Sequence, residues 1–217
     1  MKDVDGFAGS IATADFLLLN NEVPEAVNLA AVEIAQRYGV RILFNPAPAR
    51  KLPKAILEAV SIFTPNEFEE KLLAGSLELG AGSLELGAGS LELGAESLEL
   101  RAGSREQGTW CLAPETPHST RSAKSSKLPA LSSKLKAEVV TTLGAKGCRI
   151  RSTGEVIPAP SAKAVDSTGA GDTFSAVLAV RLSEDETLRD ACVAANAAAA
   201  LSVEKRFVMP ALPRRRE

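Results

Sequence analysis

The sequence has few aromatic residues and a single histidine. Phe, Trp and Tyr make up 4% of the 217 residues, and His118 is the only histidine. His118 stands among Pro, Ser and Thr residues, with no partner at a spacing typical of a metal site or a catalytic pair. Histidines in such loops are usually solvated, so histidine chemistry is not expected to organise this protein.

Cysteine and long apolar runs are scarce as well. The three cysteines, Cys111, Cys148 and Cys192, are far apart in the sequence and form no metal-ligand pattern. An odd number of cysteines, together with a polar start that lacks an apolar signal segment, predicts reduced thiols in the cytoplasm. No apolar run is long enough to span a bilayer, so a membrane partner is not expected.

Neither sign of charge dominates. Lys and Arg number 25 and Asp and Glu 27, which gives a net charge of −2. This excludes a broad basic field for nucleic acid, and we interpret Arg214–Arg216 as a short solvated tail. Apolar residues make up 45% and charged residues 24%, as in ordinary soluble globular proteins.

A tandem repeat interrupts the chain. From Gly75 the unit Gly-Ser-Leu-Glu-Leu-Gly-Ala recurs every seven residues to about Ala102. Two glycines per unit argue against a coiled coil, because each costs a helix about 1 kcal/mol relative to Ala. The residues after it, 110–133, are rich in Ser, Pro, Lys and Thr, which favours disorder. We predict a largely disordered insertion over 76–136 between an α/β part (1–75) and a second part (137–205), with a tail at 206–217.

The first part alternates between short apolar runs and helical patterns. Strands are predicted at 15–20, 41–44 and 61–64, and helices at 25–38, 54–60 and 67–74. This order implies a parallel sheet with crossover helices, and ligands bind at the carboxyl ends of such strands. Glu22, Asn45 and Asn66 all follow predicted strands, so one edge of the sheet carries all three.

The second part begins with predicted antiparallel strands at 138–143 and 148–151 and a third that ends at Ile157. Helices follow, one from about Gly171 to Leu182 and one over 187–203, and the Pro-rich tail is predicted to be irregular.

The stretch from Asp166 to Phe174 reads Asp-Ser-Thr-Gly-Ala-Gly-Asp-Thr-Phe and opens the first of these helices. The free amides and the dipole of a helix start attract an anion. Asp172 is then either an N-cap or a base placed beside a phosphate. The stretch is neither a Walker A loop nor a dinucleotide fingerprint. An ordinary capped helix after a glycine turn is the alternative.

This stretch resembles the second signature of the ribokinase-like (PfkB) sugar kinases, D-T-x-G-A-G-D-x-F. The resemblance implies ATP-dependent phosphoryl transfer to a sugar in a three-layer α/β fold with a mostly parallel sheet. It implies that Asp172 is the catalytic base and that Gly169, Ala170 and Gly171 form an anion hole with it. The resemblance also implies that Asp172 contacts the sugar.

Two further segments resemble this family. Asn-Pro-Ala-Pro-Ala-Arg at 45–50 is similar to a segment that separates the ribokinases from their relatives and so implies ribose as the substrate. Thr64-Pro-Asn-Glu67 with Glu69 is similar to T-P-N-E-x-E, which implies that Asn66 contacts nucleotide phosphates and that Glu69 organises the hydration shell of Mg²⁺. From the residues of this motif alone, a simple helix start with Asn66 as its cap is the favoured reading.

Further segments that resemble the nucleotide-binding segments of the family follow the insertion. The turn made by Thr142, Leu143, Gly144, Ala145, Lys146 and Gly147 resembles the T-L-G-x-x-G turn that runs along ATP. Asn196 matches a polar residue beside adenine, although an Asn that packs between helices is the alternative. Glu22 matches a glutamate that touches the sugar.

A potassium loop is implied next to the anion hole. The matching residues are Asp166, Thr168, Ser202 and Lys205. Phe207 stands where the family has a glycine, which argues against potassium activation.

The resemblance covers residues 8–75 and 137–205. Nothing here resembles the N-terminal strands of the family, its Gly-Gly-Lys-Gly-x-Asn motif, its early sugar-binding Asp or the β lid that makes its homodimer contact. We therefore expect a sheet with an apolar edge exposed. Three hypotheses stay open: a ribose kinase, a truncated non-catalytic chain that retains at most nucleotide binding, and another PfkB sugar or nucleoside kinase. The last is disfavoured by the segment at 45–50.

Overall fold

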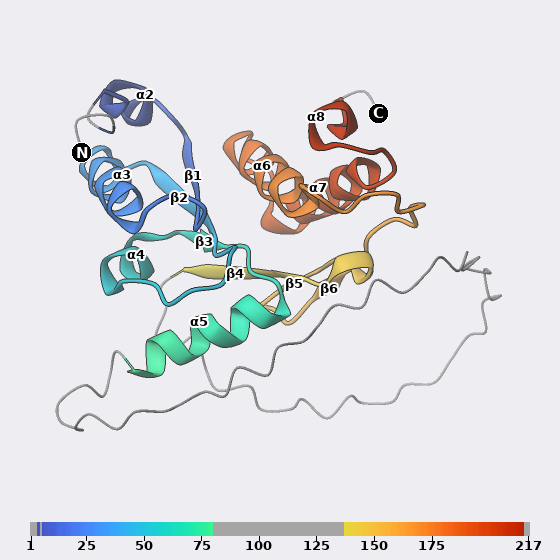
Figure 1. Cartoon of the computed structure of the whole chain (residues 1–217), viewed down its shortest axis with the longest axis horizontal. Helices are drawn as coiled ribbons and strands as arrows, with labels where there is room; N and C mark the ends of the chain where they lie inside the picture. Colours follow the sequence, from blue (N-terminus) through green and yellow to red (C-terminus); the bar gives the residue numbers. More distant parts are fainter. Residues whose placement is uncertain (1–3, 5, 80–136, 215–217) are drawn as a thin grey trace, which may run out of the picture. The chain divides into compact units, whose positions relative to one another are not determined.

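The computed structural model describes residues 4, 6–79 and 137–214. These residues form a six-stranded sheet with helices on both faces (Figure 1). The three-layer α/β fold predicted from the sequence is confirmed. The repeat beyond Leu79, Cys111 and His118 lie outside the described residues, as does all but the start of the predicted insertion.

The strands follow one another across the sheet in chain order. β1 (Phe16–Asn20), β2 (Arg41–Asn45), β3 (Ile62–Phe63) and β4 (Glu138–Thr142) are parallel, and β5 (Cys148–Ile150) and β6 (Val156–Ile157) are added antiparallel. The predicted parallel sheet ending in a meander is therefore confirmed. β3 is shorter than predicted, but the amides of Ser61 and Thr64 still donate to Ile42 and Phe44 of β2 on either side of it.

Helices cover both faces of this sheet. On one face lie α3 (Glu25–Tyr38), α4 (Lys54–Ala59) and α5 (Glu67–Leu79), with the short α2 (Ala8–Ala12) against α3. On the other lie α6 (Ala170–Ser183) and α7 (Leu188–Ser202), followed by α8 (Val208–Ala211). Among the described residues, no helix has the length and apolar character needed to cross a membrane.

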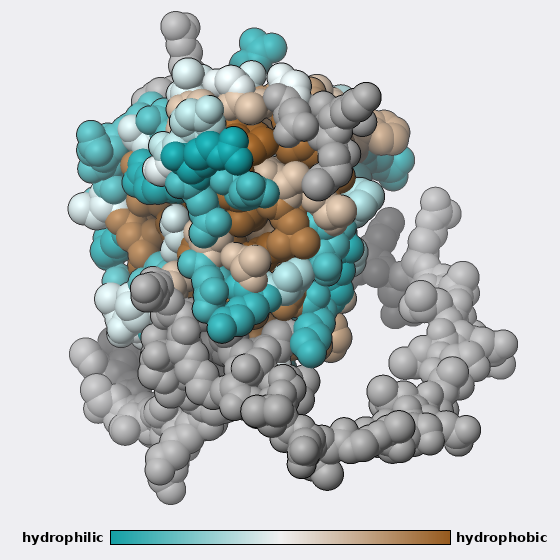
Figure 2. Space-filling model, turned by 90° about the vertical axis from the view of Figure 1, so that its left-hand side faces the viewer, coloured by the Kyte–Doolittle hydropathy of each residue, from teal (hydrophilic) through white to brown (hydrophobic). Residues whose placement is uncertain are grey.

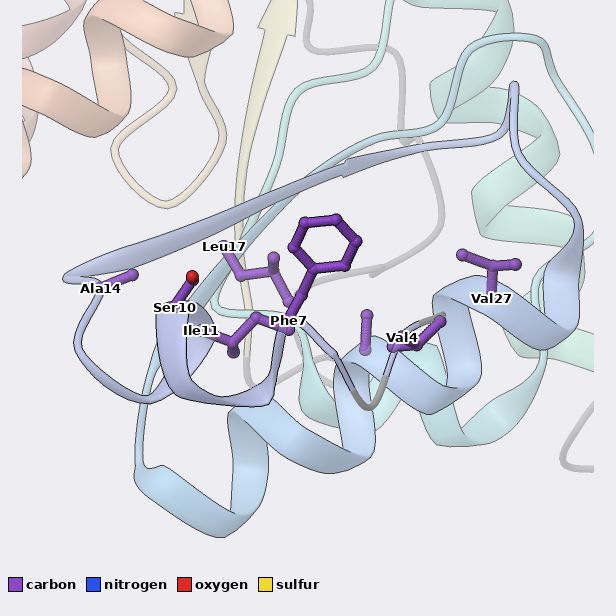
Figure 3. A pocket seen from close by; sticks show the side chains of 8 residues that line it. Val4, Phe7, Ser10, Ile11, Ala14, Leu17 and Val27 are labelled. Carbon is purple, nitrogen blue, oxygen red and sulfur yellow. The ribbon is translucent and has the colours of Figure 1, made fainter. Parts of the chain in front are cut away.

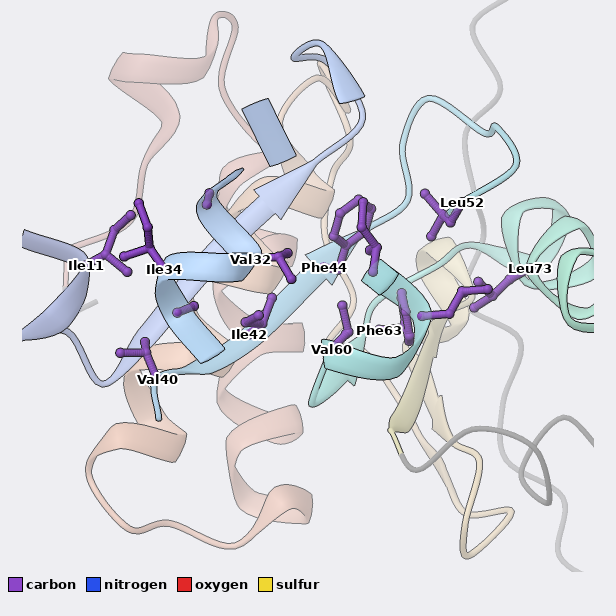
Figure 4. Packing of buried hydrophobic residues seen from close by; sticks show 14 of the residues in the cluster. Ile11, Val32, Ile34, Val40, Ile42, Phe44, Leu52, Val60, Phe63 and Leu73 are labelled. Carbon is purple, nitrogen blue, oxygen red and sulfur yellow. The ribbon is translucent and has the colours of Figure 1, made fainter. Parts of the chain in front are cut away.

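The core forms because successive strand side chains face opposite helix layers. Ile42 and Phe44 of β2 pack under α3 and α4, whereas Leu43 packs against α6 and α7. The rings of Phe44 and Phe63 lie 6.0 Å apart between their centroids and anchor the first layer (Figure 4). Each such buried side chain contributes about 1.5–3 kcal/mol.

The structure corrects three boundaries. α5 continues past its predicted end at Ala74 to Leu79, because an established helix propagates through a single glycine, Gly75, at a cost of only about 1 kcal/mol. α6 begins at Ala170, one residue before Gly171. The tail after Arg206 is not wholly irregular, because α8 forms around Pro210 with Ala211 buried.

One edge of the sheet is apolar, as predicted. β1 pairs with β2 alone among the described residues. Next to it, apolar side chains of α2, β1 and α3 line a pocket, among them Phe7, Leu17 and Val27 (Figure 3). Figure 2 shows apolar residues gathered on the side of the molecule where α2, α3 and α4 lie, bordered by hydrophilic ones.

Candidate functional site

The start of α6 is an anion-binding arrangement. Gly169 is the N-cap residue with a φ of 78°, a left-handed conformation that suits glycine, and no side chain caps the helix. The amide of Ala170 donates to the carbonyl of Ser167 at 3.2 Å. The amides of Gly169, Gly171 and Asp172 donate to no acceptor within the described part of the chain. Three of the four predicted anion-hole amides are therefore available.

Asp172 lies in the first turn of α6, past the capping position. The reading of Asp172 as an N-cap is wrong, because Gly169 occupies that position. The Asp172 side chain is exposed and has no hydrogen-bond partner among the described residues. A carboxylate in this position is free to accept a proton beside a bound anion.

One hydrogen bond ties α6 to the carboxyl end of β3, and the end of β2 lies close to the start of α6. The hydroxyls of Thr64, just after β3, and Ser175 on α6 are buried and lie 2.9 Å apart. Asn45, the last residue of β2, places its Nδ2 atom 3.9 Å from where a Cβ of Gly171 would lie. The start of α6 thus lies near the carboxyl ends of the strands, the edge of the sheet where ligands of such folds bind.

The first predicted nucleotide residues lie together. Asn66 forms a parallel bridge with Thr142, whose amide donates to the carbonyl of Pro65 at 2.8 Å. Asn66 is exposed, and its side-chain oxygen accepts the amide of Glu69 at 2.9 Å. Asn66 therefore caps α5, which does not prevent its exposed side chain from meeting a ligand.

The turn after β4 places Leu143 before a short 3-10 helix (Gly144–Lys146), in which all three residues are exposed. Gly144 has a φ of 59° and open space around its Cβ position. A Cβ on Gly147 would instead lie 2.0 Å from the carbonyl oxygen of Ile157. The close approach that requires glycine at 147 is thus to the protein's own chain.

Asn196 is turned inward. It is 3% exposed, and its Nδ2 donates to the carbonyl of Ile157 at 3.0 Å and lies 3.5 Å from Cys148 Sγ. In the structure Asn196 therefore has the packing role that the sequence analysis gave as the alternative. The hydrogen bond from the Cys192 thiol lowers the pKa of Cys148 and raises the pKa of Cys192.

The predicted sugar-binding loop is tied to the segment at 45–50. Glu22 is exposed, and its amide donates to the side chain of Asn20 at 3.1 Å. Asn21 is buried, and its Nδ2 donates at 3.0 Å to the carbonyls of both Pro46 and Pro48. Arg50 donates to the carbonyl of Val23 at 2.9 Å. The Asn-Pro-Ala-Pro-Ala-Arg segment therefore fixes the loop that carries Glu22.

The predicted potassium residues lie on two segments joined by hydrogen bonds. The amide of Asp166 donates to the carbonyl of Val203, and the Asp166 carboxylate accepts the amides of Thr168 and Phe207. The bond from Thr168, followed by that from Phe207, lowers the pKa of Asp166. The Ser202 hydroxyl donates to its own helix at Ala199, and Lys205 is exposed. Potassium binding stays a prediction, since the family resemblance assigns these residues through their backbone carbonyls.

Acidic residues near the nucleotide turn are paired or capping. Glu69 is 7% exposed; one carboxylate oxygen accepts the amide of Asn66, and the other has no partner among the described residues. Within residues 4–79 and 137–214, no three His, Cys, Asp or Glu side chains cluster as metal ligands. Glu69 therefore fits an outer role toward a phosphate-bound Mg²⁺ better than a protein-only metal site.

The family model of the pfkB family carbohydrate kinases matches residues 6–215. The chain belongs to this family. It is 31% identical over 210 residues to the ribokinase of Haemophilus influenzae, covering 95% of this chain. The solved ribokinase of Thermotoga maritima superposes with a TM-score of 0.64 and 28% identity, covering 96% of this chain and 57% of that one.

The Arabidopsis thaliana ribokinase solved with ribose and ATP shares the fold of this pfkB family chain, with a TM-score of 0.68 and 23% identity. That match covers 98% of this chain and 57% of the other. The chain spans 52–58% of the length of three curated ribokinases that it matches.

Sequence reasoning missed two features of the site. It noted Asn45 at a strand end without giving it a role. It gave no partner to Glu70, whose buried carboxylate accepts hydrogen bonds from Arg149 and Arg151 and ties α5 to β5. A signal for Asn45 was present in the sequence, because asparagines stand at the ends of all three predicted strands of the first part. The cluster of Glu70 with the two arginines had no such signal, because it joins residues on either side of the insertion.

Proposed function

We propose that this chain carries the phosphoryl-transfer site of an ATP-dependent sugar kinase that converts D-ribose to ribose 5-phosphate. The observation that carries the proposal is the start of α6, where unpaired amides of Gly171 and Asp172 stand beside the exposed Asp172 carboxylate. Membership of the pfkB family supports a carbohydrate acceptor. The segment at 45–50 and the ribokinase relatives support ribose.

In this proposal Asp172 acts as the base. Its carboxylate accepts the proton of the sugar hydroxyl while that oxygen bonds to the γ-phosphorus of ATP. The bond from this phosphorus to the bridging oxygen breaks, and ADP leaves with the electron pair. The amides of Gly169, Gly171 and Asp172 stabilise the negative charge on the phosphoryl oxygens, and the positive end of α6 adds to this effect.

ATP is assigned to Asn66 and the turn from Thr142 to Gly147. These segments are joined by the bridge between Asn66 and Thr142, and the turn is exposed at Gly144, Ala145 and Lys146. Magnesium bound with the nucleotide supplies charge neutralisation on the phosphates, and Glu69 reaches its hydration shell through the unpartnered carboxylate oxygen. Glu22 is assigned to the sugar, at the end of the loop that Asn21 fixes.

A second candidate is a nucleotide-binding chain without transfer activity. It needs only the free amides of α6 and the exposed turn at 144–146, both within the described residues. The two candidates share the anion site of α6 and differ in whether an acceptor sugar is bound.

Release of ADP with and without ribose separates these candidates. The unchanged chain should release ADP faster with ribose, and Asp172→Asn should lower that rate by about 10²–10⁴-fold, as expected for the loss of a general base. Ribose should also be preferred to fructose and to adenosine. Equal rates for the unchanged chain and Asp172→Asn contradict the kinase proposal; retained ATP binding in that case favours the second candidate.

A further inference from the structure

Three asparagines stand at the carboxyl ends of three neighbouring parallel strands. Asn20 ends β1, Asn45 ends β2 as its register partner, and Asn66 follows β3. The side-chain oxygen of each accepts the backbone amide two residues later: Glu22 at 3.1 Å, Ala47 at 3.3 Å and Phe68 at 3.0 Å, respectively. All three side-chain oxygens therefore make the same local turn. The three asparagines differ in what their side-chain NH₂ groups face.

Asn45 is the one of these three that faces α6. Its Nδ2 lies 3.9 Å from the Cβ position of Gly171. Apart from the chain neighbours of Gly171 and the backbone of α6, no other described atom lies within 4 Å of that position. Because the Ala47 amide fixes the oxygen of this side chain, its nitrogen is directed to the start of the helix. Nδ2 donates to no acceptor among the described residues. Asn45 thus places an unused donor beside the unused amides of Gly171 and Asp172.

The loop after Asn45 is held firmly. Asn21 binds the carbonyls of Pro46 and Pro48 through its side chain and the carbonyl of Ala47 through its amide at 2.8 Å. A donor on such a support keeps its direction before any ligand arrives. Fixed donors of this kind are the most effective in stabilising charge that develops during a reaction.

We propose that the Nδ2 group of Asn45 donates a hydrogen bond to the terminal phosphoryl group of the nucleotide, together with the amides of Gly171 and Asp172. The inference rests on the proposed function of α6 as the phosphoryl site. It gives the first residue of the segment at 45–50 a role in binding the transferred group, while the rest of that segment supports the sugar loop.

Two substitutions separate this role from the local turn. Asn45→Asp and Asn45→Ser both keep an oxygen that can accept the amide of Ala47. The aspartate has no donor, and the only donor of the serine is a hydroxyl that lies one bond closer to the backbone than Nδ2. The aspartate also brings a negative charge toward the phosphate. Gln36→Glu is the matched control, because it makes the same amide-to-carboxylate change on an exposed residue of α3, on the other face of the sheet.

Isothermal titration of the full chain with Mg-ATP and with Mg-ADP tests the proposal. The affinity for ATP should fall about tenfold in Asn45→Ser and further in Asn45→Asp, as for a lost hydrogen bond to a charged group. The affinity for ADP, which lacks the terminal phosphoryl group, should change less than about twofold by the same reasoning. Gln36→Glu should match the unchanged chain for both nucleotides.

The outcomes are distinct. Equal losses for ATP and ADP, or no loss for ATP, overturn the role of Asn45 and leave the proposed function standing. No binding of ATP by the unchanged chain overturns the proposed function and this inference with it. A selective loss for ATP that Gln36→Glu does not share supports the assignment.

Discussion

Asn66 and Glu69 cap one another at the start of α5. The side-chain oxygen of Asn66 accepts the amide of Glu69, and the Glu69 carboxylate accepts the amide of Asn66, both at 2.9 Å. This reciprocal arrangement is a capping box, which satisfies two backbone donors at once. The two residues that the family resemblance assigns to phosphate and magnesium thus also stabilise the helix that carries them.

Substitution of Glu69 separates its cap from its charge. A glutamine also serves in a capping box, so Glu69→Gln should change the free energy of unfolding by less than about 0.5 kcal/mol. Glu69→Ala removes the cap and should cost about 1 kcal/mol. Urea unfolding followed by circular dichroism measures both. Equal destabilisation in the two variants contradicts a capping role for the carboxylate.

The Gln variant then isolates the charge. If Glu69 acts on the hydration shell of Mg²⁺, Glu69→Gln should require more Mg²⁺ for half-maximal ADP release while its stability is unchanged. An unchanged Mg²⁺ dependence argues that Glu69 is a cap alone.

Gly147 is required by packing. A Cβ at this position would meet the Ile157 carbonyl oxygen at 2.0 Å, and the φ of 97° is unfavourable for other residues. Gly147→Ala should therefore lower the free energy of unfolding by more than about 3 kcal/mol, or prevent folding. Gly144→Ala is the control: φ is 59° and no described atom lies within 4 Å, so a cost of about 1–2 kcal/mol is expected. Thermal melting of the two variants gives the comparison, and a similar loss in both contradicts the clash.

Glu70 locks α5 to β5 through two arginines. Its side chain is 8% exposed, and those of Arg149 and Arg151 are 29% and 15% exposed. Glu70→Gln removes the charge of the carboxylate that binds both arginines and should cost about 2 kcal/mol, less than the ~3–5 kcal/mol of a fully buried pair. Denaturant unfolding measures this loss.

An exposed ion pair on α3 provides the comparison for Glu70. Glu33 and Arg37 pair at 3.3 Å with side chains 76% and 63% exposed. Glu33→Gln should change stability by less than about 0.5 kcal/mol. A loss at Glu70 no larger than that at Glu33 means that the buried cluster does not secure α5.

Phe207 holds a glycine-like backbone conformation. Its φ is 66° and ψ 144°, and its side chain is 73% exposed. A residue with a side chain is strained there by about 1–3 kcal/mol, whereas glycine is not. Phe207→Gly should therefore raise the free energy of unfolding by about 1 kcal/mol after the entropy cost of glycine. Phe207→Ala keeps the strain and should not raise the stability. Equal melting temperatures for the two variants would contradict the strain at this position.

Asp166 links two segments in a pH-dependent way. Hydrogen bonds from Thr168 and then from the Phe207 amide lower its pKa in the folded protein. A carboxylate with a lowered pKa stabilises the fold above its unfolded value of about 3.9 and loses that contribution as the pH falls further. The melting temperature of Asp166→Asn should lie below that of the unchanged chain at pH 7, and the gap should close below about pH 4. A gap independent of pH contradicts a role for the charge.

The sequence by itself determined much of the layout around α6. Apolar runs alternating with helical patterns predicted the parallel strands and the helix at 25–38, which α3 matches. The glycine turn before Asp172 predicted a helix start with free amides, because this property depends on backbone geometry over a few adjacent residues.

The tertiary structure alone decided which of these residues meet. Asn45 faces Gly171, and the carboxylate of Glu70 binds Arg149 and Arg151 across the insertion. It also showed that Asn196 binds the Ile157 carbonyl and that Gly147 accommodates the same group. Local patterns fix where a helix or strand begins, but contacts between distant segments depend on how both faces of the sheet are packed, which no short stretch encodes.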